Sequence, residues 1–551
     1  MPRPYLPIPR SIARAALAIL VMWAAVAAAC SADEADPEPA ATTAPAAAVQ
    51  PQPTADAVTS PTPTSTPLPT PTPRPLPTAT PRAWPEASSE PIGDAEAAEL
   101  MDTLLDTEAT EEALRLALAR IVRSDDERFA AVLIELLWAR DTRILSKGLE
   151  YLEYYDALEA ITEANVGPNR HYWVQWYGAS DLEPPPGFTG WKGRLFSVID
   201  EQFGEFLSDE HPSAIRVEEI LWGGVLVDSI PPLEFPNMLP PDEVDYIEPD
   251  EAVFGIAING EAHAYPLRIL DWHEMANIEV GGVPISLAYC TLCGAAIAYD
   301  DRGPDGETYN FGTSGFLYRS NKLMYDRSTR TLWNQFTGEP VLGPLVGKLD
   351  LAGEPLRLNL LPVVLSTYAD WLARHPDTVV LDINTGFLRP YEQGAAYGHY
   401  FSVPETMFPV WLTNNELFLK EYIYGLRIAG ARKAYPIDIL ADERVVNDTL
   451  GGRSVVLVTE QEIDTLGYGR GVGPVLYNSG GEVRAFERGD RRFFPGPEGG
   501  TVVDATGAEW EVTENALVGP DGEQLERISG HLAFWFGWYA FFPETELYSG
   551  G

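Results

Sequence analysis

The chain has 551 residues and a formal net charge of −43 at pH 7, from 81 acidic and 38 basic side chains. This length exceeds what one hydrophobic core normally supports, so two or more folded units are expected. Such an acidic protein repels nucleic acid and anionic lipid surfaces, which argues against both as binding partners.

The N-terminus has the features of an export signal. Three arginines precede the apolar run AALAILVMWAAVAAA, which is short for a membrane-spanning helix and ends in small residues. Ala27-Ala28-Ala29-Cys30 resembles a bacterial lipobox, although a Leu usually stands at the position of Ala27. We therefore predict a lipoprotein signal peptide at 1–29 and a lipid on Cys30 that anchors an extracytoplasmic protein to the membrane. Cleavage at another nearby site would instead give a secreted protein.

Three segments of different composition follow the signal. Residues 30–90 are rich in Ala, Pro and Thr, cannot bury a core, and predict a disordered stalk. Residues 91–165 place apolar side chains at helical spacing, which predicts a small α-helical domain for packing or for docking an unidentified protein partner. Residues 166–250 are aromatic and Pro-rich, which predicts loops wrapped over a sheet.

The remaining sequence is β-rich and internally repeated. Apolar runs of strand length are separated by Asn-Gly, Gly-Gly and Pro-Asp-Gly turns. The stretch from Val253 to Tyr289 recurs without a gap at Ile423 to Thr459. We therefore predict an α+β protein whose main part is a mainly-β duplicated module of two pseudo-repeats, at 251–400 and 401–551.

The two copies share residues that a fold needs and differ in residues that carry chemistry. Both keep an Ala-Tyr-Pro turn, an Ile-Leu pair, an Asn and a Gly-Gly turn. Only the first copy has a candidate functional site, because its reactive residues are replaced in the second. The replacements are His273 by Glu443, Glu274 by Arg444, Cys290 by Glu460, and Cys293 by Ile463.

Cys290 and Cys293 give the strongest local signal. A Cys-x-x-Cys-Gly turn points two sulfurs and several backbone amides into one small volume, as in zinc knuckles and redox turns. The chain has only three cysteines. If Cys30 carries lipid, the remaining pair in an oxidising compartment must be a metal site, a redox pair or a structural disulfide.

Metal binding is the main functional prediction. A closed four-cysteine zinc site is excluded within one chain, because no further cysteine is available. A mixed site for copper or zinc would use both thiolates and His273, with Glu274 or His399 as a fourth ligand or a supporting residue. The alternatives are a thiol–disulfide oxidoreductase that uses the same cysteines, and a non-catalytic surface scaffold with a structural disulfide.

The segment after the cysteines holds further candidates from the first copy. Phe311-Gly312-Thr313-Ser314-Gly315 resembles an anion-binding glycine turn, but no Lys follows it and no helix start is evident. Ser314 also lacks a Gly-x-Ser-x-Gly elbow, which disfavours a serine hydrolase. The alternation in YRSNKLMYD and the turn DRSTRT instead predict a hairpin. Its charged candidates are Arg319 and a buried ion pair between Asp326 and Arg327.

Several long motifs of the chain resemble those of one known family. They are EEILWGGVLVDSIPPLEFP, NGEAHAYPLRILDWHEMAN, YCTLCGAAIAYD, FGTSGFLYRSNKLMYDRSTRTLWNQFTGEPVLGPLVGK and HPDTVVLDINTGFLRPYEQGAAYGHY. They resemble the prokaryotic "domain of unknown function 3179" family, closely over 170–400 and more loosely in the second copy. The resemblance implies no particular activity. The family pattern has Asn-Asp after His-Glu, whereas in this chain Ile278 follows Asn277, which is a further candidate residue.

Overall fold

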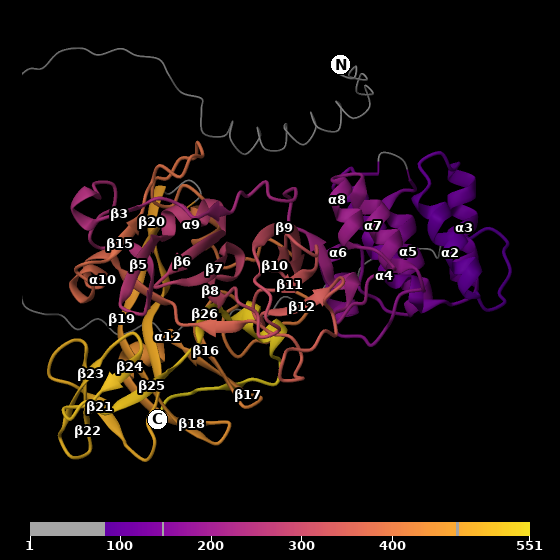
Figure 1. Cartoon of the computed structure of the whole chain (residues 1–551). Helices are drawn as coiled ribbons and strands as arrows, with labels where there is room; N and C mark the ends of the chain where they lie inside the picture. Colours follow the sequence, from indigo (N-terminus) through magenta and orange to yellow (C-terminus); the bar gives the residue numbers. More distant parts are fainter. Residues whose placement is uncertain (1–82, 146–147, 470–472) are drawn as a thin grey trace, which may run out of the picture. The chain divides into compact units, whose positions relative to one another are not determined.

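The computed structural model describes residues 83–145, 148–469 and 473–551. The predicted signal peptide, Cys30 and most of the predicted stalk lie outside the described residues. The described part is a mixed α+β structure, with helices in its N-terminal region and β-sheets through most of the remainder (Figure 1). Within this part, we find no helix with both the length and the apolar character needed to cross a bilayer.

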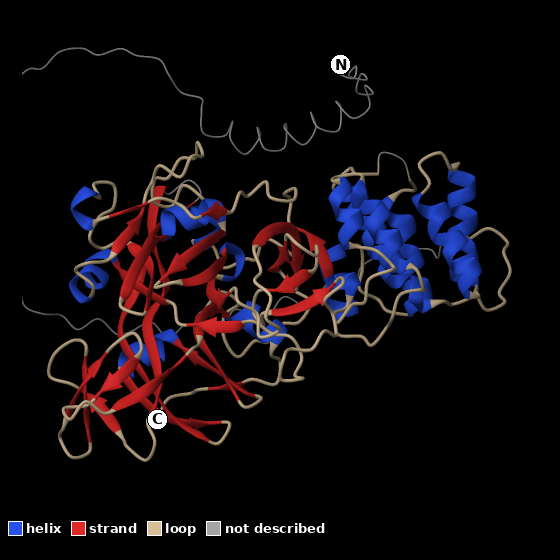
Figure 2. Ribbon diagram, in the orientation of Figure 1, coloured by secondary structure: helices blue, strands red, loops and turns tan. Residues whose placement is uncertain are grey.

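The N-terminal region is helical because its apolar residues recur at helical spacing and polar caps mark several helix starts. The side chains of Thr110, Asn169 and Asp200 each accept a hydrogen bond from a backbone N–H of the following helix. Helix formation continues beyond residue 165, into the segment predicted as loops, because two of these caps lie there (Figure 2). The helices are α2 (Asp94–Leu105), α3 (Glu111–Arg123), α4 (Ala130–Asp141), α5 (Tyr151–Thr162), α6 (Arg170–Gly178), α7 (Phe188–Ser197) and α8 (Glu201–Phe206).

A buried ion pair joins these helices to the first strand of the β-region. Lys192 of α7 is fully buried, and its Nζ donates to Glu135 Oε1 of α4 at 2.6 Å. The same nitrogen donates to the backbone oxygen of Ile220 at 2.6 Å. One hydrophobic cluster also runs through both regions, so the helices and the sheets share a core.

The described residues of the β-region form five sheets, in each of which neighbouring strands are joined by hydrogen bonds. Across the first sheet the strands are β1 (Ile220–Trp222), β9 (Phe311–Tyr318), β10 (Asn321–Asp326), β11 (Leu332–Asn334) and β12 (Glu339–Leu342). Across the second they are β13 (Asn359–Leu361), β8 (Ala295–Asp300), β7 (Val283–Cys290), β6 (Met275–Val280) and β2 (Leu233–Glu234). Across the third they are β14 (Val364–Thr367), β4 (Ala252–Ile258), β5 (Glu261–Pro266), β15 (Val379–Leu381) and β3 (Met238–Leu239).

The other two sheets belong to the C-terminal half. The fourth sheet is β26 (His531–Phe534), β16 (Tyr422–Ile428), β17 (Ala431–Pro436) and β27 (Glu546–Leu547). The fifth is β18 (Val445–Leu450), β19 (Arg453–Gly469), β20 (Gly473–Glu487), β25 (Gln524–Ile528), β24 (Ala516–Val518), β23 (Glu509–Val512), β22 (Thr501–Asp504) and β21 (Phe493–Pro495). Short helices between strands are α9 (Leu267–His273), α10 (Tyr368–Arg374), α11 (Gly398–Phe401), α12 (Ile437–Glu443) and α13 (Trp535–Phe541).

Two stretches of the β-region have the same order of elements. β4, β5, α9, β6 and β7 follow one another in the first stretch, and β16, β17, α12, β18 and β19 in the second. In both, a late short strand joins the second strand in parallel. Val379 pairs with His263 in the first stretch, and Glu546 pairs with Lys433 in the second.

A tryptophan packs against a strand glycine at the same place in each stretch. A Cβ added to Gly255 would lie 2.3 Å from Cζ3 of Trp371, and one added to Gly425 would lie 2.2 Å from Cζ3 of Trp538. Each indole nitrogen donates at 2.9 Å to a threonine seven residues later in the chain. Both positions therefore require glycine, because the indole ring occupies the space of a Cβ.

Candidate functional site

The Cys-x-x-Cys turn joins two neighbouring strands of one sheet. Cys290 is the last residue of β7, Cys293 ends the short 3-10 helix η5 (Thr291–Cys293), and β8 begins after Gly294. Gly294 has φ 59°, a left-handed conformation that glycine adopts without steric cost. Both cysteines are free thiols, with 2% of Cys290 and 0% of Cys293 exposed. The turn therefore holds both sulfurs inside the protein.

A buried ion pair lies beside Cys290. The Nζ of Lys322, on β10, donates to the backbone oxygen of Glu274 at 2.8 Å and lies 3.6 Å from its carboxylate Oε2. Glu274 Oε1 accepts hydrogen bonds from Thr291 Oγ1 at 3.0 Å and from Tyr397 OH at 3.2 Å. Glu274 is itself held at φ 54°, directly after α9. One cation and one carboxylate are therefore fixed next to the dithiol.

The two thiols differ in acidity. Burial by itself would raise the pKa of the Cys290 thiol, and the carboxylate of Glu274 acts in the same direction. Hydrogen bonds from Cys293 and from the backbone N–H of Lys322, together with the Lys322 charge, outweigh both and lower this pKa. Burial and the neighbouring Cys290 raise the pKa of Cys293 well above its usual value. Cys290 is therefore the more acidic thiol of the pair.

A small cavity is lined by Cys290 but not by Cys293. Its volume is about 50 Å³. Cys290, Glu274 and Lys322 all line it. Most of the remaining wall is apolar and comes from β9, β10 and nearby loops, with Val225, Ile230, Leu292, Phe316, Leu317 and Phe408 among the lining residues. Cys290 is therefore the sulfur that a small molecule in this cavity would meet.

The C-terminal half packs closely against the cysteine turn. A Cβ added to Gly537 of α13 would lie 3.3 Å from the sulfur of Cys293. A Cβ added to Gly294 would lie 2.5 Å from the hydroxyl of Tyr422, on β16. Residues of the second half therefore enclose Cys293.

Glu274 lies beside the dithiol, whereas the two predicted histidine ligands contact other parts of the chain. His273 Nδ1 lies 2.8 Å from the backbone oxygen of Pro231, and Nε2 lies 2.5 Å from Tyr391 OH. His399 Nδ1 lies 3.3 Å from a backbone oxygen of β19. Across residues 83–145, 148–469 and 473–551, no group of three or more His, Cys, Asp or Glu side chains could hold a metal ion. Copper or zinc binding therefore remains a prediction, and the five proposed ligands are not assembled.

Three further first-copy candidates make structural hydrogen bonds. Asn277 Nδ2 donates to a backbone oxygen of β9 at 2.8 Å, and Ser314 Oγ donates to one of β10 at 2.6 Å. Arg319 Nε donates to Glu219 Oε2 at 2.5 Å, and Nη1 donates to a backbone oxygen of α13 at 2.5 Å. Ser314 lines the cavity, although its hydroxyl is already used within the hairpin.

The predicted ion pair between Asp326 and Arg327 does not form. The Asp326 carboxylate instead accepts hydrogen bonds from the side chains of Ser328 and Thr329 in its own turn and from Trp333 on β11. Arg327 Nη1 lies 2.7 Å from Asp228 Oδ2, and Nη2 lies 3.3 Å from Glu234 Oε1. Consecutive side chains at the end of a strand leave on opposite faces, so adjacent charges in the sequence need not meet.

The later of the two similar stretches has an ion pair at the position that corresponds to Cys290. Glu460, which occupies the position of Cys290, lies 3.0 Å from Arg374. Arg444, in the place of Glu274, has a similar backbone, with φ 61°. The backbone oxygens of Arg444 and Glu274 accept equivalent strand N–H groups at 2.8 Å and 2.9 Å. The same local backbone therefore carries different chemistry.

Two residues of the site were not predicted from the sequence. Lys322 supplies its cation, and Tyr397 supplies a hydroxyl to Glu274. The available signal for Lys322 was a lysine directly before the apolar run LMY, which is unusual in a buried strand. Tyr397 had no comparable signal, because it comes from a distant loop.

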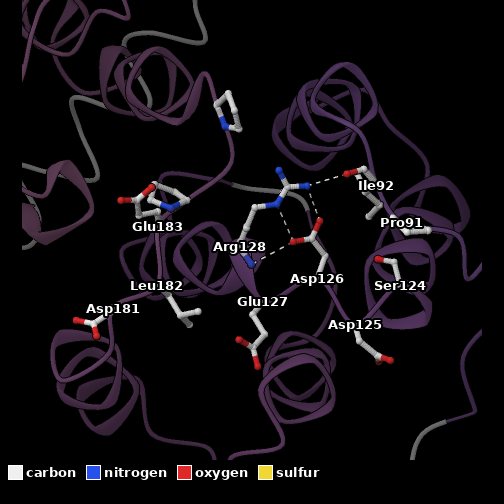
Figure 3. A pocket seen from close by; sticks show the side chains of 12 residues that line it. Pro91, Ile92, Ser124, Asp125, Asp126, Glu127, Arg128, Asp181, Leu182 and Glu183 are labelled. Atoms are coloured by element: carbon white, nitrogen blue, oxygen red, sulfur yellow. Dashed lines mark hydrogen bonds and ion pairs between the residues drawn. The ribbon is translucent and has the colours of Figure 1, made fainter.

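A larger cleft in the helical region has a different character. Its volume is about 750 Å³, and acidic side chains dominate its lining, among them Asp125, Asp126, Glu127 and Glu183. Arg128 is the cation in its wall, and Figure 3 shows it directed at Asp126 and at the backbone oxygen of Ile92. The cleft has no thiol in its lining, so the dithiol cavity is the stronger candidate site.

Asp301 predicts a pH dependence of stability close to neutrality. It is 4% exposed, and burial raises its pKa to about 7, with Asp300 and Glu234 adding repulsion and Ser286 opposing the shift. Since the folded pKa lies above the unfolded one, its stabilising contribution is complete below about pH 4 and is lost as the pH rises through 7. At pH 8 the free energy of unfolding of Asp301→Asn, measured in urea, should therefore exceed that of the parent chain by about 1–3 kcal/mol, and the gain should be small at pH 4.

Asp300→Asn is the matched control for this measurement. Asp300 is more exposed, pairs with Arg302 at 2.7 Å and contributes less than burial to the shift at Asp301, so its replacement should bring a much smaller gain at pH 8. Equal unfolding curves of Asp301→Asn and the parent chain at pH 8 would contradict the raised pKa.

The motifs of the chain agree with a comparison against known families. A family profile described as "protein of unknown function (DUF3179)" matches residues 227–545, which include the cysteine turn and most of the C-terminal half. Searches among curated proteins and solved structures gave no match. The profile covers more than half of the 551 residues, so the chain belongs to the DUF3179 family of proteins of unknown function.

Proposed function

We propose that the protein is a thiol oxidoreductase in which Cys290 attacks and Cys293 resolves. The observation that carries this proposal is the asymmetry of the pair, because Cys290 lines a cavity beside the Lys322 cation while Cys293 lies behind it. A thiolate is the reactive form of cysteine, and a nearby cation and amide stabilise it. The neighbouring protonated thiol is positioned to complete a disulfide.

The proposed reaction removes two electrons from the dithiol. The Cys290 thiolate attacks one atom of a weak bond in an oxidant, either S–S or O–O, and the other atom leaves with the electron pair of that bond. The Cys293 sulfur then bonds to the Cys290 sulfur and expels the first atom, while the Cys293 proton goes to the departing group. The products are one disulfide and the reduced oxidant.

We also infer that the two halves of the β-region are copies, of which only the first is chemically active. The recurrence of 253–289 at 423–459, the common order of elements and the equivalent tryptophan–glycine contacts support this inference. The second half then acts as a scaffold that encloses Cys293. An ion pair at Glu460 in place of the thiol agrees with this division.

The cellular setting proposed for this chemistry is extracytoplasmic. The export signal at 1–29 and a lipid on Cys30 would tether the protein to a membrane through a disordered stalk at 30–90. In that compartment a free dithiol is unusual unless it has a redox or metal-binding role. The strong negative charge disfavours nucleic acid as a partner.

Single cysteine variants test the proposed roles. In the reduced chain, Cys293→Ser should be alkylated at Cys290 by iodoacetamide, a reagent of only a few non-hydrogen atoms, while oxidation of the parent chain to its disulfide should protect Cys290 from the same reagent. Cys290→Ser should react roughly 100-fold more slowly, because Cys293 is buried and protonated. Mass spectrometry after a rapid acid quench measures each product.

The same set of samples includes a control variant and tests the two competing hypotheses. Glu460→Gln, at the equivalent position of the second copy, should react like the parent chain. Equal reactivity of the two single-cysteine variants would count against the proposed roles. One bound copper or zinc per chain with both thiols protected would favour the metal hypothesis instead, and a disulfide that exchanges with no dithiol would favour the scaffold.

A further inference from the structure

The dimensions of the cavity restrict what can reach Cys290. A buried site needs roughly 10–15 Å³ for each water-sized group, and this cavity has a volume of about 50 Å³. It therefore admits a molecule of only a few non-hydrogen atoms. Cys290 is 2% exposed and Cys293 is 0% exposed, so neither sulfur is available at the surface.

Attack on a disulfide needs more space than this cavity offers. The attacking sulfur must approach one sulfur of the substrate along the line of its S–S bond, so the substrate chain must extend away from the thiolate. The wall of the small cavity at Cys290 includes the apolar residues Leu292, Phe316 and Leu317, and its volume of about 50 Å³ leaves no room for such a chain. A peptide disulfide would have to displace this wall.

Resting on the function proposed above, we propose that the oxidant of Cys290 is a small hydroperoxide, with hydrogen peroxide the best fit. Lys322, Glu274 and Tyr397 line the cavity with Cys290, and the two other polar lining residues, Thr313 and Ser314, already donate their hydroxyls to backbone oxygens. The first three are mutually fixed, since Lys322 Nζ lies 3.6 Å from Glu274 Oε2 and Tyr397 OH lies 3.2 Å from Oε1. A peroxide has donors and acceptors on both oxygens and suits such a mixed set.

The chemical step balances with the residues present. The Cys290 thiolate attacks one peroxide oxygen, the O–O bond breaks, and the leaving hydroxide takes a proton from Lys322, giving water and a sulfenic acid on Cys290. Lys322 then regains a proton from solvent. The Cys293 sulfur attacks the sulfenic sulfur, the S–O bond breaks, and the released hydroxide takes the Cys293 proton as a second water. One peroxide is reduced by two electrons and one dithiol is oxidised to a disulfide.

The test compares three oxidants on the full reduced chain. Equimolar hydrogen peroxide, cumene hydroperoxide or oxidised glutathione is added, and disulfide formation between Cys290 and Cys293 is followed by quenched-flow mass spectrometry. Hydrogen peroxide should oxidise the pair at least about 100-fold faster than it oxidises free cysteine. Cumene hydroperoxide should be at least about 10-fold slower than hydrogen peroxide, after correction for their rates with free cysteine. Oxidised glutathione should leave the pair reduced over the same period.

Two variants sharpen the measurement. Cys293→Ser should stop at a sulfenic acid on Cys290, which dimedone traps as a single adduct. Met407 lines the cavity and is 52% exposed, so Met407→Ala should widen its entrance and reduce the preference for hydrogen peroxide over cumene hydroperoxide.

The possible failures are distinguishable. If oxidised glutathione closes the disulfide as fast as hydrogen peroxide does, and no sulfenic acid is trapped, the peroxide inference is overturned while the thiol oxidoreductase stands. If none of the three oxidants converts the native pair, although both thiols react after unfolding in urea, both proposals fall.

Discussion

Replacing Lys322 with methionine is expected to lower the free energy of unfolding by about 3–5 kcal/mol at pH 7 and to make Cys290 less reactive. Lys322 is 4% exposed, and its Nζ lies 3.6 Å from the Glu274 carboxylate. Its removal leaves Glu274 buried without a countercharge and also removes the cation that lowers the pKa of the Cys290 thiol. Urea unfolding measures the first effect, and the pH dependence of iodoacetamide labelling measures the second.

Two controls separate the buried charge from the loss of a lysine. The double variant Lys322→Met with Glu274→Gln removes both charges, so it should recover a substantial part of the lost stability. Lys348→Met removes a more exposed lysine, whose side chain is 36% exposed, from its pair with Asp305 at 2.7 Å, and should cost less than Lys322→Met does. A loss of less than about 1 kcal/mol in Lys322→Met, with no change in labelling, would show that the pair is neither costly to break nor connected to the thiol.

The position of the candidate site could be predicted because the chain contains its own comparison. The cysteines lie where the two similar stretches of sequence diverge, and the Gly-Gly turn lies where they agree. Gly281 and Gly282 have φ 55° and 76°, so both residues of this hairpin turn need the left-handed conformation. Local backbone requirements of this kind are visible in a sequence, since a single residue type satisfies them.

The partners of the thiols could not be predicted, because side-chain direction decides them. His273 and Glu274 are adjacent, but the helix ends between them and Glu274 takes a left-handed conformation. The His273 ring is therefore directed to Pro231 and Tyr391, whereas Glu274 reaches Thr291. Proximity to the cysteine strand alone placed both residues in the predicted metal site.

Contacts between segments far apart in the sequence could not be predicted either. Lys322 meets Glu274 only because the hairpin of β9 and β10 packs over the cysteine turn. Gly537 comes within reach of Cys293 only because α13 of the C-terminal half lies against the same turn. Neither contact can be predicted from hydrophobic periodicity, because periodicity describes one segment at a time and each contact joins two distant segments.

The second large effect is expected from Arg484→Met, which should destabilise the chain by about 3–5 kcal/mol at pH 7. Arg484 is fully buried between two carboxylates: its Nη1 lies 2.8 Å from Glu482 Oε1, and its Nη2 lies 2.6 Å from Glu514 Oε1. Glu482 also accepts a hydrogen bond from Ser366 at 3.1 Å, so the network joins the two halves of the β-region. Without the guanidinium, two buried carboxylates would face each other with incomplete compensation.

The pH dependence of this loss identifies its cause. Burial would raise the pKa of Glu514, but Arg484 and His375 hold it far below its usual value of 4.5. A depressed folded pKa stabilises the protein above pH 4.5, and this contribution is lost as the pH falls through the folded value. The difference in free energy of unfolding between Arg484→Met and the parent chain should therefore be largest near neutral pH and shrink in acid, where the carboxylates of the variant take up protons.

Arg491→Met is the control for Arg484→Met. Its pair with Glu523 is exposed, so the substitution should change stability by less than about 1 kcal/mol. A loss in Arg484→Met that is the same at pH 4 and pH 7 would point to packing rather than to the unpaired carboxylates.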